Sequence, residues 1–329
     1  MRRREFILVL GGAAAWPLAA RAQQQARLPS VGVLLPYSTE RDFRAQANWL
    51  PFKQRLQELG WIEGRNIRFE YRLTGENAES IRVAAKELVA TAPDVIVPFT
   101  NLEVPAVLQA TQTIPVVFVL VSDPLGSGFV DSLARPGRNI TGFQNFETEM
   151  GGKWLQLLTE IAPAVRRVGF IYNQNIAANV ELMHAAEAAS RSSGKTVTAI
   201  DLQKAVDIEP AFTNFSRESG GGVIVGPNPF NADNHEKIIT LAARLQLPAI
   251  YPYRYFAQNG GLVSYGFDQV EELRGAAVYV HRILRGEKPA NLPVQAPTKY
   301  ELVINLKAAS ALGLDLSPQL QQRADEVIE

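Results

Sequence analysis

Short apolar runs alternate with amphipathic segments along the chain from residue 30 onward. The runs are rich in β-branched and aromatic residues and predict strands, and several are apolar almost throughout, which is typical of strands covered on both faces. Between them, apolar residues recur at helical spacing with charged residues on the opposite face. The predicted strands are 31–35, 67–71, 94–99, 116–121, 167–172, 197–200, 223–225 and 248–251, and the predicted helices are 43–59, 78–90, 103–112, 152–161, 179–192, 208–219 and 234–245.

This alternation predicts an α/β fold with two doubly wound parallel sheets. A strand, a helix and a second strand in sequence return the second strand parallel to the first. The chain has 329 residues, and at about 150 residues per domain that length suggests two domains. Hydrophobic residues make up 47% of the chain, enough for a sizeable core in each.

The first 22 residues have the pattern of a signal peptide. Three arginines at positions 2–4 precede an apolar run from Phe6 to Ala20, and Ala20-Arg21-Ala22 then fits a small-x-small cleavage site. The run is shorter than the roughly 20 apolar residues that span a bilayer, which disfavours the alternative of a membrane anchor. We expect cleavage near Ala22, a polar leader over 23–29 and a mature protein in the periplasm. Arg3-Arg4 also resembles a twin-arginine export signal.

Charge and cysteine content exclude several functions. Lys and Arg number 33, as do Asp and Glu, so the chain has no net charge that would attract it to nucleic acid. The absence of cysteine excludes disulfides, thiolate metal sites, a cysteine nucleophile and a lipid-modified cysteine. We therefore expect no nucleic-acid partner.

No motif in the sequence indicates catalysis. Residues 126–131 begin as Gly-x-Gly but have Asp where a dinucleotide fingerprint has its third Gly, and residues 261–266 do not match a nucleophile elbow. His184, His235 and His281 lie far apart, without metal-ligand spacing. We expect a protein that is not an enzyme and has neither cofactor nor metal.

Polar and aromatic residues follow the predicted strands where each one ends. In open α/β sheets, ligands bind outside the carboxyl ends of the strands, so two such sheets facing each other would enclose one small polar ligand. Turns and helix caps also favour Ser, Asn and Asp, and several of the rings are equally consistent with a core position. The candidate binding residues at these strand ends are Tyr37, Ser38, Phe99, Thr100, Asn101, Ser122, Asp123, Tyr172, Asn173, Asn228, Phe230, Tyr251 and Tyr253.

Long stretches of the chain resemble the ABC transporter substrate-binding proteins of the type I periplasmic-binding fold, in the branch that includes tryptophan- and tyrosine-uptake proteins. The resemblance covers essentially the whole chain, and its strongest matches are framework segments. These are the leader 3–7 with 20–22, and 114–118, 122–125, 133–137, 139–142, 280–289, 300–307 and 311–314.

The resemblance implies two lobes joined by three crossover strands that close on a ligand by hinge motion. Its crossings would lie near 141–142, 265–266 and 296–297. The first lobe would comprise 30–140 plus 267–295, and the second 142–264 plus 298–329. The resemblance further implies a monomer that delivers its solute to a membrane permease, with ATP consumed by a separate subunit.

An amino-acid-like ligand assigns roles to some of the candidates. Its ammonium requires a carboxylate, for which Asp123 and Asp268 are available, although Asp268 fits better as an N-cap with Glu271 three residues on. Aromatic rings would stack on a planar ligand. Its carboxylate would meet hydroxyls and N–H groups at a helix start, with Ser38, Thr100, Asn101 and Ser122 as candidates.

A second function remains open at this point, because a fold does not determine a function. The same two-lobe fold also serves as a ligand sensor, so a periplasmic sensing partner of a membrane receptor is the alternative. A DNA-reading repressor is disfavoured because no basic helix-turn-helix precedes Ser30 and the leader predicts export.

Overall fold

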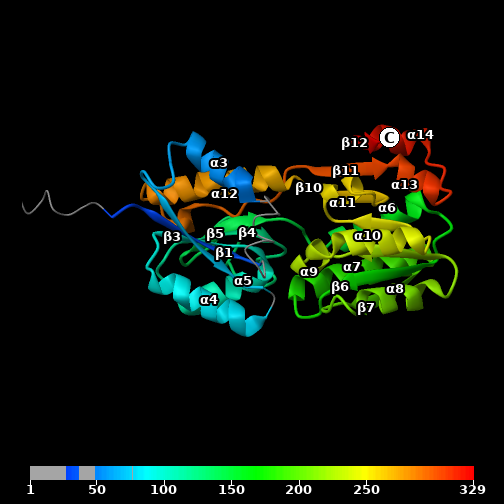
Figure 1. Cartoon of the computed structure of the whole chain (residues 1–329), viewed down its shortest axis with the longest axis horizontal. Helices are drawn as coiled ribbons and strands as arrows, with labels where there is room; N and C mark the ends of the chain where they lie inside the picture. The colour runs from blue at the N-terminus through cyan, green and yellow to red at the C-terminus, as the bar shows by residue number, and fades with distance from the viewer. Residues whose placement is uncertain (1–26, 37–48, 76) are drawn as a thin grey trace, which may run out of the picture.

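The computed structural model of the chain describes residues 27–36, 49–75 and 77–329, which form two α/β lobes side by side (Figure 1). The predicted signal peptide, most of the leader, and the candidates Tyr37 and Ser38 lie outside these residues. The predicted α/β architecture with two sheet-based lobes is confirmed.

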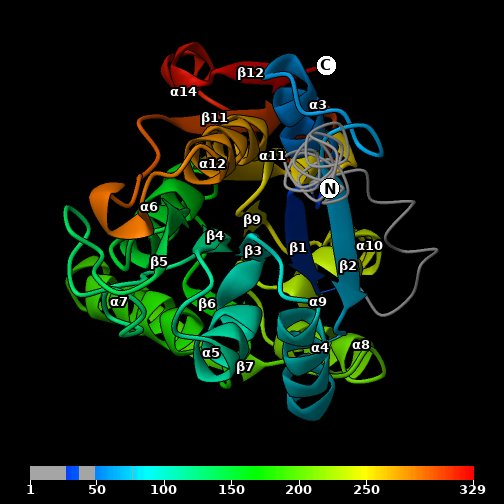
Figure 2. The ribbon, with the colours of Figure 1, turned by 90° about the vertical axis from the view of Figure 1, so that its left-hand side faces the viewer.

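The first lobe is built on a parallel sheet of five strands in the order β2-β1-β3-β4-β5. Helices α3 and α12 cover one face of this sheet and α4 and α5 the other (Figure 2). The strands are β1 (Ser30–Leu35), β2 (Arg68–Leu73), β3 (Val95–Pro98), β4 (Val116–Val121) and β5 (Ile140–Gln144), and the helices are α3 (Leu50–Glu58), α4 (Ala78–Ala90), α5 (Thr100–Ala110), α12 (Gln269–Leu284) and the 3-10 turn η2 (Pro289–Asn291).

The second lobe has a sheet of seven strands in the order β12-β11-β10-β9-β8-β6-β7. Its strands are β6 (Arg167–Tyr172), β7 (Thr196–Asp201), β8 (Gly221–Val225), β9 (Ala249–Tyr251), β10 (Val263–Phe267), β11 (Tyr300–Asn305) and β12 (Glu326–Ile328). Its helices are α6 (Met150–Ile161), α7 (Ala177–Ser193), α8 (Ile208–Ser216), α9 (Pro229–Asp233), α10 (His235–Arg244), α11 (Arg254–Gln258), α13 (Leu306–Ala311) and α14 (Pro318–Arg323).

One strand pair of the second sheet is antiparallel, which the alternation of strands and helices did not predict. β10 pairs with β11 antiparallel, from Val263 opposite Ile304 to Phe267 opposite Tyr300. The reason is the path of the chain: β10 runs toward the first lobe, where the chain forms α12, and β11 returns from that lobe in the opposite direction.

Local sequence explains where the elements begin and which face they bury. α4 begins at Asn77, whose side chain accepts hydrogen bonds from the N–H groups of Glu79 and Ser80, a preferred N-cap. Its buried residues Ile81, Ala84, Ala85 and Leu88 recur at helical spacing, so a single stripe of the helix packs on the sheet. α7 ends at Gly194, which takes the left-handed conformation (φ 64°) that glycine adopts without strain.

The chain passes between the lobes three times. The passages are 145–149 after β5, Asp268 between β10 and α12, and 296–299 before β11. The predicted crossings near 141–142 and 265–266 fall inside β5 and β10, because these strands extend their own sheets up to the passages. Rotation of the lobes about these segments stays a prediction.

Among the described residues, no helix combines the length and apolar character needed to cross a membrane. The same residues hold no cluster of three or more His, Cys, Asp or Glu side chains suited to a metal ion.

Candidate functional site

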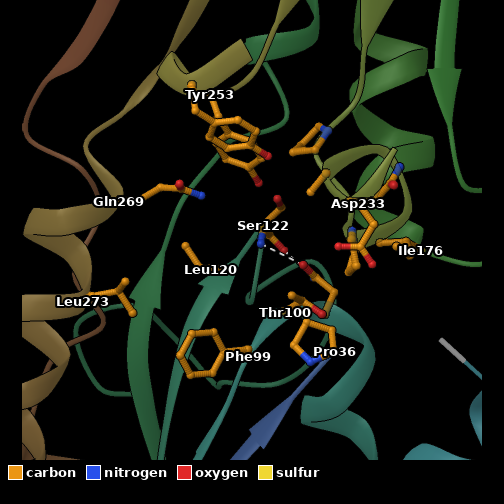
Figure 3. Close-up of a pocket in the computed structure, with 16 residues that line it drawn as sticks. Pro36, Phe99, Thr100, Leu120, Ser122, Ile176, Asp233, Tyr253, Gln269 and Leu273 are labelled. Atoms are coloured by element: carbon orange, nitrogen blue, oxygen red, sulfur yellow. Dashed lines mark hydrogen bonds between the residues drawn. The ribbon is translucent and has the colours of Figure 1, made fainter. Parts of the chain in front are cut away.

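A pocket lies between the two lobes, at the carboxyl ends of the strands of the first sheet (Figure 3). The free space around it, which includes the open mouth and the solvent there, is about 770 Å³. The first lobe contributes Pro36, Phe99, Thr100, Asn101, Leu120, Ser122, Gln269 and Leu273, and the second contributes Ile176, Pro227, Asn228, Pro229, Ala232, Asp233, Tyr253 and Tyr255.

The start of α5 and the end of β4 are joined by hydrogen bonds at the first-lobe wall. The amide nitrogen of Asn101 donates to the carbonyl of Ser122 at 2.7 Å, and the N–H of Ser122 donates to the amide oxygen of Asn101 at 2.9 Å. The Ser122 hydroxyl donates to Asn145 Oδ1 at 2.7 Å and keeps its lone pairs as acceptors. These polar side chains therefore serve first to fix the edge of the pocket.

Thr100 begins α5 at the same wall and has a left-handed backbone (φ 61°), which is uncommon for threonine. Its hydroxyl donates to Glu103 Oε2 at 2.6 Å, and the fully buried Glu103 also accepts from the Thr74 hydroxyl at 3.0 Å. The N-terminal turn of an eleven-residue helix is thus fixed at the pocket, where its dipole favours a negatively charged ligand group.

The second-lobe wall is a loop held by amide side chains. Asn228 caps α9 by accepting from the N–H of Asn231 at 2.8 Å, and its nitrogen donates to Asn179 Oδ1 at 3.0 Å. Asn179 in turn donates to the carbonyl of Pro227 at 2.9 Å. The Pro227–Pro229 loop is therefore rigid, and its amides are occupied within the protein.

Aromatic rings face each other across the pocket. Tyr253 and Tyr255 stack with ring centroids 5.7 Å apart and an angle of 15° between their planes. Burial, together with the nearby Glu272 carboxyl, raises the pKa of the Tyr253 phenol well above its usual value, so the phenol stays protonated. Figure 3 shows the Tyr253 ring above Phe99 and Pro36, with Gln269 and Leu273 on one side and Ile176 and Asp233 on the other.

The pocket contains one formally charged side chain among its described lining residues, that of Asp233. No Lys or Arg is among these residues. Asp233 is exposed and closes α9. Asp233 therefore supplies the negative charge among the described lining residues.

The structure brings about half of the predicted candidates together. Phe99, Thr100, Asn101, Ser122, Asn228 and Tyr253 line the pocket. Tyr37 and Ser38 lie outside the described residues. The remaining candidates, Asp123, Tyr172, Asn173, Phe230, Tyr251 and Asp268, do not line it.

Both carboxylates predicted for a ligand ammonium act as local caps. Asp123 Oδ1 accepts from the N–H of Gly126 at 2.9 Å and closes the turn after β4. Asp268 Oδ1 accepts from the N–H groups of Val270 and Glu271 at 2.8 and 3.4 Å, so the N-cap interpretation of Asp268 is confirmed. Asp268 lines a separate polar hollow beside the interlobe passages.

The aromatic candidates that do not line the pocket belong to the second-lobe core. Tyr251 is fully buried and stacks on Phe256 with centroids 4.9 Å apart. Phe230 is buried in the same core, and Tyr172 packs against it. Asn173 forms a turn, accepting from the N–H of Asn175 at 2.9 Å. These residues therefore occupy the turn and core positions that the sequence had left open as the alternative.

Several lining residues were not among the candidates, which had been chosen at the ends of the predicted strands. Gln269 and Leu273 lie four residues apart on one face of α12, which packs on β4, a contact that sequence order does not indicate. Asp233 is the last residue of the short helix α9, and Ile176 is the N-cap of α7. Tyr255 could have been predicted from the sequence, because it is a further aromatic residue only two positions after the candidate Tyr253.

The family model described as "ABC transporter substrate binding protein" matches residues 46–328. The chain belongs to this family. The resemblance inferred from the sequence is confirmed, and because members of the family bind substrates without transforming them, the chain is a binding protein and not an enzyme. Export is typical of the family.

Three relatives illustrate the range of similarity. The tyrosine-binding protein of Clostridioides difficile (strain R20291) is 22% identical over 271 residues, covering 80% of this chain and 75% of that protein. A conserved domain protein from Vibrio cholerae has a structure with a TM-score of 0.84 at 28% identity, and an ABC domain from Streptococcus pneumoniae in complex with L-Trp has a TM-score of 0.83 at 21% identity. Both structures match 92% of this chain and 100% of their own.

Proposed function

We propose that the protein is the periplasmic solute-binding component of an ABC importer. It captures a small aromatic or polar, amino-acid-like solute between its lobes and delivers it to the membrane permease. The observation that carries this proposal is the pocket itself, to which each lobe contributes half of the described lining residues. A solute held there touches both lobes and stabilises their closed arrangement.

The rings at the pocket support an aromatic or flat apolar solute. Tyr253 and Tyr255 form one wall and Phe99 the opposite one, so a planar group between them stacks on both sides. The relatives point the same way, since one is named for tyrosine and another holds L-Trp.

The polar groups support an amino acid in one orientation. Asp233 faces the pocket from the second lobe and suits an ammonium group, a role for which the sequence had offered Asp123 and Asp268. The start of α5, with the positive end of its dipole, suits a carboxylate at the first-lobe wall. The two charged groups of the solute would therefore bridge the lobes.

A thermal-shift series on the mature protein, beginning at Gln23, tests this proposal. L-Tyrosine and L-tryptophan are compared with tryptamine, which lacks the carboxylate, with indole-3-propionate, which lacks the ammonium, and with ribose as a control solute. A solute at about 100 times its dissociation constant stabilises the native protein by about 2.7 kcal/mol. We expect a clear rise in Tm with an aromatic amino acid and a smaller one with either truncated analogue. No shift with any aromatic compound would refute the solute class.

Asp233→Asn provides a matched variant for the same series. Removing the charge while keeping the shape is expected to weaken L-tryptophan binding and to leave indole-3-propionate binding equal or stronger. Equal weakening of both would show that Asp233 acts on the loop and not on the ammonium. Sequencing the N-terminus of the protein from the periplasmic fraction tests the export and the cleavage near Ala22.

A further inference from the structure

Strand β4 is irregular where it reaches the pocket. Its pairing with β5 shifts in register between Phe118 and Val121. Inside this bulge, Leu120 has a left-handed backbone (φ 56°), which is unusual for a leucine and persists only where the surroundings impose it. Bulges of this kind redirect a side chain, and the side chain of Leu120 lines the pocket.

Glu272 of α12 supplies the hydrogen bond that the bulge removes from the sheet. The N–H of Leu120 donates to Glu272 Oε1 at 2.5 Å, across 152 positions of sequence. A backbone N–H inside a protein requires an acceptor, and the carboxyl oxygen of Glu272 takes that place. The side chain of Glu272 is 7% exposed, so this contact is shielded from water.

The second carboxyl oxygen of Glu272 does not take part in a comparable hydrogen bond. Oε2 is buried and has no hydrogen-bond partner among the described residues. Burial raises the pKa of the Glu272 carboxyl to about 8, and the phenols of Tyr253 and Tyr300 are the titratable groups that sense its charge. At neutral pH the group is therefore mainly a neutral acid, with its carbonyl oxygen turned to Leu120.

A buried, half-satisfied carboxyl is generally worse for stability than an apolar residue of the same size. Among the described residues its carboxyl accepts from the N–H of Leu120, and Glu272 also lines the polar hollow beside Asp268. The neighbouring residues on the same face of α12, Gln269 and Leu273, line the pocket, so Glu272 connects this wall to the bulge in β4.

We propose that Glu272 is a positioning residue of the solute pocket: its carboxyl holds the bulge of β4 and so fixes Leu120 and Ser122 at the pocket floor. The inference rests on the proposed function only in taking this pocket as the solute site. The geometry of the bulge itself is testable without any solute.

The first test measures amide hydrogen exchange in the solute-free protein. Glu272→Leu keeps the volume but removes the acceptor, whereas Glu272→Gln keeps a carbonyl oxygen and imitates the neutral acid. For the peptide covering 116–124 we expect roughly tenfold faster exchange in Glu272→Leu and a change within about twofold in Glu272→Gln. Peptides from β6 and β8 serve as the internal control and should not change.

Three results would overturn the proposal. They are an unchanged 116–124 peptide in Glu272→Leu, an equal acceleration in β6 and β8, which indicates general destabilisation, and a Glu272→Gln variant that behaves like Glu272→Leu.

A second test covers the case in which Glu272→Leu folds poorly. Glycine adopts the φ of position 120 without strain, so Leu120→Gly should reduce the dependence on Glu272. We expect the loss in Tm caused by Glu272→Leu to be about half as large, or less, in the Leu120→Gly background. Equal losses in both backgrounds, or failure of both variants to fold, contradict the proposal.

Solute binding is measured last, with L-tryptophan as the probe. We expect roughly tenfold weaker binding for Glu272→Leu and rescue to within about threefold for Glu272→Gln. Failure of the wild-type protein to bind any solute counts against the proposed function, and the exchange result still decides the role of Glu272.

Discussion

The side-chain amide of Asn101 makes two hydrogen bonds to the backbone of Ser122, one in each direction. Its nitrogen donates to the Ser122 carbonyl and its oxygen accepts from the Ser122 N–H, at 2.7 and 2.9 Å. This pair ties the start of α5 to the end of β4, the two elements that form the first-lobe wall. A residue that the strand-end pattern had marked for ligand contact thus has a structural role at the pocket.

Replacing Asn101 by Ala should therefore lower stability as well as binding. Loss of two backbone hydrogen bonds at about 1 kcal/mol each predicts a free energy of unfolding lower by about 2 kcal/mol, measured by urea denaturation. Asn101→Asp is the matched variant, because it keeps the acceptor for the Ser122 N–H but places a carboxylate oxygen against the Ser122 carbonyl, and it should show at least as large a loss. Unchanged stability with weakened binding would show that Asn101 contacts the solute directly.

Alanine variants of two aromatic residues should distinguish a core position from a pocket position. Phe230→Ala is expected to lower the free energy of unfolding by about 3–5 kcal/mol, since the ring is buried in the second-lobe core, with solute affinity little changed in the folded fraction. Tyr255→Ala should weaken binding by about 1–3 kcal/mol with the smaller effect on stability, because Tyr255 is only partly buried and lines the pocket. Calorimetry and urea denaturation on both variants decide between these patterns, and the reverse assignment would contradict the pocket as described.

The protonation of Glu272 predicts a pH dependence of stability. The carboxyl has an ordinary pKa of 4.5 when unfolded and one of about 8 in the native protein. Between these values the native protein holds a proton that the unfolded chain has lost, so the free energy of unfolding falls as pH rises, by up to about 1.4 kcal/mol per unit.

Glu272→Gln has no such proton to lose. Its stability relative to the wild type should therefore increase steadily from pH 5 to pH 8, as measured by urea denaturation at each pH. A constant difference across this range would show that the carboxyl is ionised throughout.

Because Asp268 caps α12, replacing it is expected to change stability and not solute affinity. Asp268→Ala should lower the free energy of unfolding by about 1 kcal/mol, because two N–H groups at the start of α12 lose their acceptor. Asp268→Ser, which restores a capping oxygen, should recover most of this loss. Solute affinity is expected to stay within about twofold in both. A large loss of affinity at unchanged stability would return Asp268 to the ligand site.

Much of the fold follows from local signals in the sequence. Helix α4 has the predicted bounds 78–90, because a capping Asn and a clear apolar stripe define it without help from the rest of the protein. The antiparallel β11 was not predictable in the same way, since its direction depends on the chain leaving the second lobe and returning.

The site was only partly predictable for a related reason. The strand-end rule located the edge formed by Phe99, Thr100 and Ser122, which depends on parallel pairing alone. It could not separate Tyr251 from Tyr253, two residues apart, of which the first is in the core and the second lines the pocket. How deeply an aromatic side chain is buried, and the packing of α12 on β4, depend on tertiary structure. Neither can be predicted from the local sequence pattern.

A crystal structure of the mature protein with the aromatic solute that raises its Tm most would show directly where the solute binds. We expect density for the solute between Phe99 and the stacked pair Tyr253 and Tyr255, in contact with both lobes. Density on one lobe alone, or in the polar hollow beside Asp268 and Lys299, would contradict this expectation.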